Sequence, residues 1–183
     1  MSTELWFAFV AASVVLLIIP GPTILTVISY ALAHGRRATV PLVAAVALGD
    51  STALVVSLLG LGALLTTAAL WFTVLKWAGS LYLLYLGVQL LRAGVSSAEL
   101  GTATVPDSRR RLFANTSVVT ALNPKSIVFF VAFLPQFIDP SMDATPQLWI
   151  LAVTFVVLAA VSATLYAVFA GSALSSTERY ARC

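Results

Sequence analysis

The sequence predicts an all-α integral membrane protein, and three observations carry this prediction. The chain has 183 residues, of which 60% are hydrophobic and 9% are charged, whereas soluble domains average about 25% charged residues. Its mean hydropathy is +1.01. It contains five apolar stretches, each long enough for the roughly 20 residues with which a helix crosses about 30 Å of hydrocarbon. We therefore expect one transmembrane domain of five helices over residues 1–183.

The first apolar stretch, residues 5–33, is interrupted by Pro20-Gly21-Pro22. Prolines remove backbone donors from a helix, and in lipid the freed carbonyl groups need partners from protein or from a water-filled cavity. The interruption is therefore typical of a simple proline kink, the commoner outcome, or of the discontinuous helices that build midplane binding sites in transporters. The amino terminus lacks the basic region and cleavage site of a signal peptide, so we expect this helix to be retained.

Short polar turns separate the remaining apolar stretches. These stretches are expected over residues 40–67, 70–91, 112–138 and 148–174, followed by a short polar tail. A second interruption, Asn123-Pro124-Lys125, falls within the fourth stretch. The basic linker 93–111 divides the chain into a first three-helix repeat, residues 1–92, and an incomplete second repeat, residues 112–183. Two three-helix units run in opposite orientations, so we expect a 3+3 inverted repeat whose sixth helix is missing.

Basic residues gather in alternate loops, which is the positive-inside pattern of inner-membrane proteins. They are Arg36 and Arg37 in the first loop, Arg92 and Arg109 to Arg111 in the third, and Arg179 and Arg182 in the tail. We expect a multi-pass protein of the bacterial inner membrane with its N-terminus outside and its basic loops in the cytoplasm. The net charge of +3 is then a topology signal, and no nucleic-acid partner is expected.

Three charged residues lie inside the apolar stretches: Asp50, Lys76 and Lys125. Each costs about 2.5 to 3.5 kcal/mol at a helix centre, so such residues are rare unless they are paired or functional. Asp50 fits a proton-coupling group and fits equally a structural ion pair with Lys76 or Lys125. Lys76 lies nearer a membrane edge, where its side chain could also snorkel to the surface.

Lys125 follows Pro124 at the start of a resumed helix, where backbone donors are free. A lysine beside those donors favours an anion site suited to a carboxylate, with Asn123 as the helix cap. Snorkelling is the alternative here too, although it would need a long reach from the middle of the stretch.

The sequence contains no pattern typical of catalysis or of metal binding. A Gly-rich phosphate loop, a metal-ligand cluster and a catalytic triad are all missing, and Cys183 is the only cysteine. We therefore expect no enzymatic activity, no cofactor, no metal site and no intrachain disulfide.

Several motifs together carry a family resemblance. They are Pro20-Gly21-Pro22, Gly49-Asp50, the segment from Lys76 to Gly87, Asn123-Pro124-Lys125, Phe129-Phe130 and Pro135-Gln136-Phe137. Their order and spacing resemble the LysE/RhtB family of amino-acid exporters over most of the chain. The resemblance implies a six-helix inner-membrane carrier that exports amino acids or similar metabolites in exchange for protons. The chain departs from the family at its carboxyl end, where the family has one more helix.

The resulting hypothesis is a secondary exporter that works by alternating access. The substrate is expected at the two interruptions, against Lys125, Pro20, Gly21, Pro22, Asn123 and Pro124. Asp50 would accept the proton or bind the substrate amine, and Lys76 would pair with it in one state. The expected partners are an amino acid or similar small molecule, protons and the lipid bilayer, and a homo-oligomer is left open. The alternative is a non-transporting truncated fragment, or a membrane helper that needs a partner helix.

Overall fold

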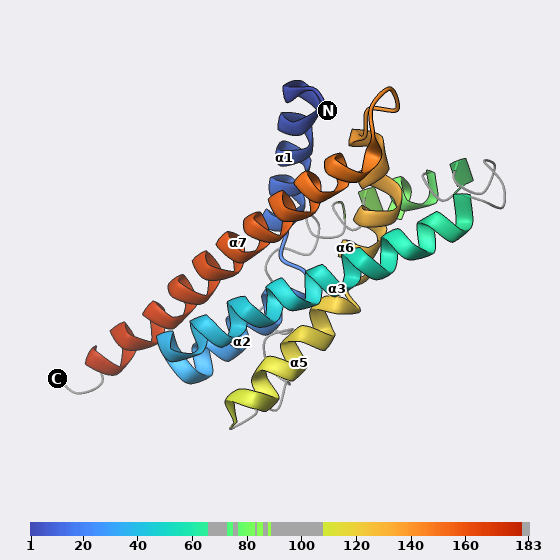
Figure 1. The fold of residues 1–183 in the computed structure, drawn as a ribbon. Coiled ribbons are helices and arrows are strands. Elements are labelled where there is room, and N and C mark those ends of the chain that lie inside the picture. The colour runs from blue at the N-terminus through green and yellow to red at the C-terminus, as the bar shows by residue number, and fades with distance from the viewer. Residues whose placement is uncertain (66–72, 75–76, 83, 86–87, 89–107, 181–183) are drawn as a thin grey trace.

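The structure, a computed structural model, describes residues 1–65, 73–74, 77–82, 84–85, 88 and 108–180. All regular secondary structure within these ranges is helical (Figure 1), which confirms the predicted all-α class. The described helices that are long and apolar enough to cross a membrane are Thr39–Gly60, Arg109–Phe137 and Ala144–Ser172, with one bent pair as a further candidate. Half of the expected third stretch and most of the basic linker lie outside the described residues. The count of five helices and the inverted repeat therefore stay predictions.

The bent pair is the first apolar stretch, which divides into α1 (Thr3–Ile18) and α2 (Pro22–His34) at an angle of 54°. Helix α2 begins with proline at its first position, where the missing N–H has no role in the helix. The predicted interruption is confirmed as a break between two helices. Throughout, the first break means residues 19–21.

The turn η1 (Gly35–Ala38) leads into α3 (Thr39–Leu65), the second apolar stretch. Gly35 has a φ of 62°, in the left-handed region that glycine adopts without strain, and this residue ends α2. The chain reverses here, so α3 returns along the bundle past the first break (Figure 1).

The second half repeats the pattern of a broken helix. Helix α5 (Arg109–Ala121) is followed by the short α6 (Pro124–Val128), whose cap is Asn123 as the sequence predicted. The second break means residues 122–123. The chain continues through a π-helical turn, η3 (Phe129–Phe133), and a 3-10 turn, η4 (Leu134–Phe137).

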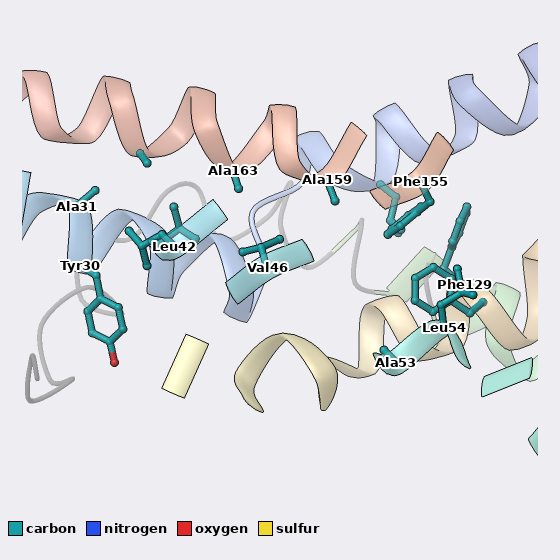
Figure 2. Close-up of a cluster of buried hydrophobic side chains, with 14 of the residues drawn as sticks. Tyr30, Ala31, Leu42, Val46, Ala53, Leu54, Phe129, Phe155, Ala159 and Ala163 are labelled. Carbon is teal, nitrogen blue, oxygen red and sulfur yellow. The ribbon is translucent and has the colours of Figure 1, made fainter. Parts of the chain in front are cut away.

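Helix α7 (Ala144–Tyr180) is longer than the expected fifth stretch at both ends. Residues 175–180, expected as a polar tail, continue the helix, because this segment holds no glycine or proline that would end it. A buried stripe recurs every four residues along α7 and faces α2 and α3 (Figure 2). The stripe consists of Leu151, Phe155, Ala159, Ala163 and Ala167.

Aromatic rings close the core where α1, η3 and α7 meet. The ring centroids of Phe130 and Phe155 lie 4.7 Å apart, and those of Phe129 and Phe155 lie 5.6 Å apart. Phe9 of α1 packs against the same cluster, with its ring centroid 5.9 Å from that of Phe129. These contacts tie α1 to η3 and α7.

Candidate functional site

The two breaks meet inside the bundle, and two polar side chains join them. The Lys125 ammonium donates hydrogen bonds to the backbone oxygens of Leu16, at 2.9 Å, and Ile19, at 2.7 Å. The Asn123 side-chain amide donates to Thr23 Oγ1 at 3.0 Å. Asn123 in the second break and Lys125 just after it therefore contact the start of α2 and the end of α1. The sequence predicted both breaks but did not predict which atoms would connect them.

The prolines explain why these carbonyl groups need partners. In an uninterrupted helix the carbonyl of Leu16 would accept the N–H four residues later, but that residue is Pro20, which has none. The Lys125 ammonium supplies the missing donor. A positive charge at the carboxyl end of α1 is also favoured by the helix dipole.

The second proline of the first break has the same effect on Ile18. Its carbonyl would accept from residue 22, which is Pro22. The Tyr166 hydroxyl of α7 donates to this oxygen instead, at 2.9 Å. Tyr166 was not predicted from the sequence. Its hydroxyl inside an apolar helix was a signal that a partner exists, but nothing in the sequence identified that partner.

Lys125 does not reach for a membrane surface, so the snorkelling alternative is wrong. Its side chain is 7% exposed, and its ammonium is held by carbonyl groups inside the protein. Its backbone N–H donates to Asn123 Oδ1 at 3.1 Å, which confirms the predicted cap. The anion site expected beside these donors stays a prediction.

Asp50 of α3 lies beside Lys125 and is 3% exposed. The Ser126 side chain hydrogen-bonds the carboxyl group, and the Lys125 charge attracts it through space. Asp50 Oδ1 has no hydrogen-bond partner in the part of the chain that the structure describes. Ser126 is a second residue that the sequence reasoning missed, although it directly follows Lys125. Lys76, the other expected partner of Asp50, lies outside the described residues.

A cavity of about 20 Å³ lies between the breaks. Its polar lining includes Asp50, Asn123, Lys125 and Ser126, and Gly21 forms part of its wall. A β-carbon added at Gly21 would lie 3.4 Å from Lys125 Nζ. This volume holds about one water molecule and is too small for an amino acid, so the structure is closed around the site.

Four of the eight expected site residues line this cavity: Gly21, Asp50, Asn123 and Lys125. Pro20, Pro22 and Pro124 shape the breaks without lining it. No group of three or more metal-ligating side chains occurs among the described residues.

Comparisons with known proteins give a separate line of evidence. A family model described as LysE type translocator matches residues 5–183. The homoserine/homoserine lactone efflux protein of Salmonella typhimurium is 39% identical over 170 residues, which cover 93% of this chain and 82% of that protein. The leucine efflux protein of an Enterobacter species is 26% identical over 167 residues, covering 91% of this chain and 79% of that protein. No solved structure matches the chain.

Proposed function

Because the chain belongs to the LysE type translocator family, we propose that it is a secondary-active carrier that exports amino acids across the bacterial inner membrane in exchange for protons. One observation carries this proposal. Two broken helices meet at a closed cavity that holds a buried carboxyl group and a buried ammonium group, Asp50 and Lys125. Paired breaks at a buried polar site are the arrangement by which many transporters bind substrate near the membrane midplane.

The contacts of Lys125 suggest how an amino acid enters. In the closed state its ammonium donates hydrogen bonds to the carbonyl groups of Leu16 and Ile19. A zwitterionic substrate carries an ammonium group like that of Lys125 and a carboxylate that can pair with a lysine. Its own ammonium replaces Lys125 at the carbonyls of α1, and its carboxylate binds the released lysine. The exchange leaves every charge paired, which is necessary in a site that excludes water.

Asp50 is the proton carrier in this proposal. Its carboxyl group shares the cavity with Lys125, and one of its oxygens has no partner among the described residues. Ionised Asp50 attracts the substrate ammonium and helps to hold it at the carbonyl groups of α1. A proton on Asp50 removes this attraction and releases the substrate. Proton and substrate therefore occupy the site in turn, as an exchange of one for the other requires.

The test uses purified protein in liposomes, with labelled homoserine and labelled leucine as probes because the relatives carry those names. Wild-type protein is expected to exchange at least one probe across the membrane and to move it against a gradient when a pH gradient is imposed. Asp50→Asn is expected to keep the exchange and to lose the response to the pH gradient. Asp143→Asn, in an exposed loop, is the matched control.

Two results would contradict the proposal. If Asp50→Asn protein at normal membrane levels responded to the pH gradient as wild type does, Asp50 would not carry the proton. If wild-type liposomes exchanged neither probe, the assignment to these amino acids would be wrong.

A further inference from the structure

A groove much larger than the cavity lies next to it, between α1 and α7. Its volume is about 390 Å³, against about 20 Å³ for the cavity. Its apolar walls include Val14, Leu17 and Ile18 of α1 and Val161, Leu165 and Phe169 of α7. All of these side chains except Leu17 are exposed, so the groove opens on the outer face of the bundle, where lipid is expected. We call it the α1–α7 groove.

Leu17 separates the groove from the cavity, because it is the one described residue that lines both spaces. No charged side chain occurs among the described residues that line the groove. Two hydroxyl groups border it, those of Ser162 and Tyr166, and the Tyr166 hydroxyl already donates to the carbonyl of Ile18. A polar space that holds Asp50 and Lys125 therefore lies one side chain away from a larger apolar space.

The cavity must enlarge to hold an amino acid, and Leu17 is the wall that can move at the lowest cost. Of the other described lining residues, all but Gly21 are buried. Ile24, Val46 and Ala159, for example, are 4% exposed or less, and a side chain in a close-packed core cannot move without its neighbours. Leu17 is only half-buried and has the groove behind it. Its side chain can turn into that space by a change between staggered rotamers.

The contacts of Lys125 place the substrate side chain beside this wall. The carbonyl groups that receive the substrate ammonium in the proposed exchange belong to Leu16 and Ile19, which flank Leu17 in the sequence. The ammonium and the side chain of an amino acid are bonded to the same carbon atom. A substrate held at these carbonyl groups therefore presents its side chain close to Leu17.

We propose that the α1–α7 groove receives the side chain of the substrate, with Leu17 as the movable wall, and that the protein prefers amino acids with large apolar side chains such as leucine. The inference rests on the proposed function and names the substrate class of the same site. An apolar side chain gains by leaving water for Val161, Leu165 and the surrounding lipid. A charged side chain would be desolvated there without a partner among the described residues of the groove.

The first test compares leucine with alanine, which carries the same two charged groups and a much smaller side chain. Wild-type protein in liposomes is expected to reach half-maximal exchange at a leucine concentration at least about tenfold below that of alanine, because leucine buries three more apolar carbon atoms. Val161→Phe and Ser162→Phe fill the groove and are expected to remove most of this preference. Val153→Phe is the matched control, because Val153 is an exposed valine of α7 outside the groove. Equal half-saturation by leucine and alanine in wild type, or a preference that both groove variants keep, would overturn the inference.

A variant of Leu17 tests the movable wall itself. Leu17→Ala joins the cavity to the groove without any rotation of a side chain. Unlabelled phenylalanine, whose side chain is larger than that of leucine, is expected to compete with labelled leucine at least about threefold better in this variant than in wild type. Competition by phenylalanine that Leu17→Ala leaves unchanged would contradict the role given to Leu17.

The second test measures binding and does not depend on transport. Because a ligand that binds only the folded protein raises its Tm, leucine is expected to raise the Tm of wild-type protein in lipid nanodiscs more than alanine does at the same concentration. Val161→Phe and Ser162→Phe are expected to remove the difference, and Val153→Phe to keep it. If leucine raised the Tm of wild type no more than alanine, the groove would be covered by lipid alone and the inference would be overturned. Selective stabilisation by leucine without any exchange in liposomes would instead contradict the proposed function alone.

Discussion

At the scale of single residues, the first break is stabilised by side chains that replace missing backbone donors. Pro20 and Pro22 each deprive one carbonyl group of its helical partner, and Lys125 and Tyr166 supply the two replacements. The sequence shows that such partners must exist, because lipid cannot satisfy a carbonyl group. It does not show which side chains they are, because both partners lie more than 100 residues away in the sequence.

Tyr166→Phe isolates one of these replacements. The change removes only the hydroxyl that donates to Ile18, so the carbonyl group is left unpaired on a face of the bundle that the lipid is expected to cover. We expect a loss of about 1 to 3 kcal/mol of stability, measured as a lower Tm in detergent. Tyr85→Phe is the control, because the Tyr85 side chain is exposed. If Tyr166→Phe unfolded at the wild-type temperature, the hydroxyl would not be holding the break.

Lys125 shows how far residue-scale reasoning extends. Its position after Pro124 predicted a functional lysine at a break, and the structure places its ammonium at the other break. The sequence reasoning considered only the backbone donors of the lysine's own helix. It could not include the carbonyl groups of α1, because their distance from Lys125 is set by the packing of α1 on η3 and α7.

At the scale of helices, Gly49 sets the distance between α3 and α5. A β-carbon there would lie 2.5 Å from Thr120 Cβ and 2.7 Å from the backbone oxygen of Ser117. The backbone atom cannot turn aside, so Gly49→Ala must push the helices apart. We expect a loss of about 1 to 3 kcal/mol, seen as a lower Tm.

Gly60→Ala, in the same helix, is the matched control for this change. No atom of the described residues lies within 4 Å of a β-carbon added at Gly60. Alanine is favoured over glycine in a helix interior by up to about 1 kcal/mol, so this variant is expected to be as stable as wild type or more so. Equal stability losses at both glycines would show that close packing against α5 is not the cause.

The loop between η4 and α7 is held by hydrogen bonds to a carboxylate and to an amide. The Asp139 carboxyl group accepts a hydrogen bond from the Ser141 side chain, which has the larger effect, and one from the Ser141 backbone N–H. These bonds hold the pKa of Asp139 below its usual range. Gln147, buried at the start of α7, bonds both the N–H and the carbonyl of Asp139. The loop is therefore tied to α7 from two sides.

The depressed pKa of Asp139 gives a pH prediction. Because the folded form favours the ionised carboxylate, its contribution to stability is present above the unfolded pKa and is lost as the pH falls through the folded pKa. Ser141→Ala is expected to raise the titration midpoint of Asp139 towards the usual value for aspartate. The midpoint can be followed by NMR with labelled aspartate, using Asp139→Asn to assign the signal. A midpoint unchanged by Ser141→Ala would show that Ser141 does not stabilise the charge.

Prediction from the sequence was uneven among the helices for a physical reason. Proline marks both breaks because its chemistry is local, so the boundaries near Pro22 and Pro124 were predicted closely. The π-helical turn at Phe129–Phe133 has no local signal. It lies where phenylalanine rings from α1 and α7 pack against the turn, and such packing is not visible in one stretch of sequence.

At the scale of the whole molecule, the closed cavity lies between two opposite ends of the helical bundle. The N-terminus and the loop before α7 lie at one end of the bundle, and the start of α5 and the end of α7 lie at the other (Figure 1). The cavity between the breaks lies between these ends and admits no amino acid as it stands. Under the proposed function, transport requires the breaks to separate towards each end in turn, which is what alternating access means for this fold.

The orientation of these ends in the membrane is directly testable, because Cys183 is the only cysteine. Cys183→Ser gives a background without thiols, into which single cysteines are placed at Met142 and Ser108, both exposed and at opposite ends of the bundle. The basic residues after Ser108 predict that this end is cytoplasmic. A membrane-impermeant thiol reagent is expected to label Met142→Cys in intact cells, and Ser108→Cys only after the membrane is permeabilised. The opposite pattern would reverse the predicted topology and place the basic loops outside, against the positive-inside pattern.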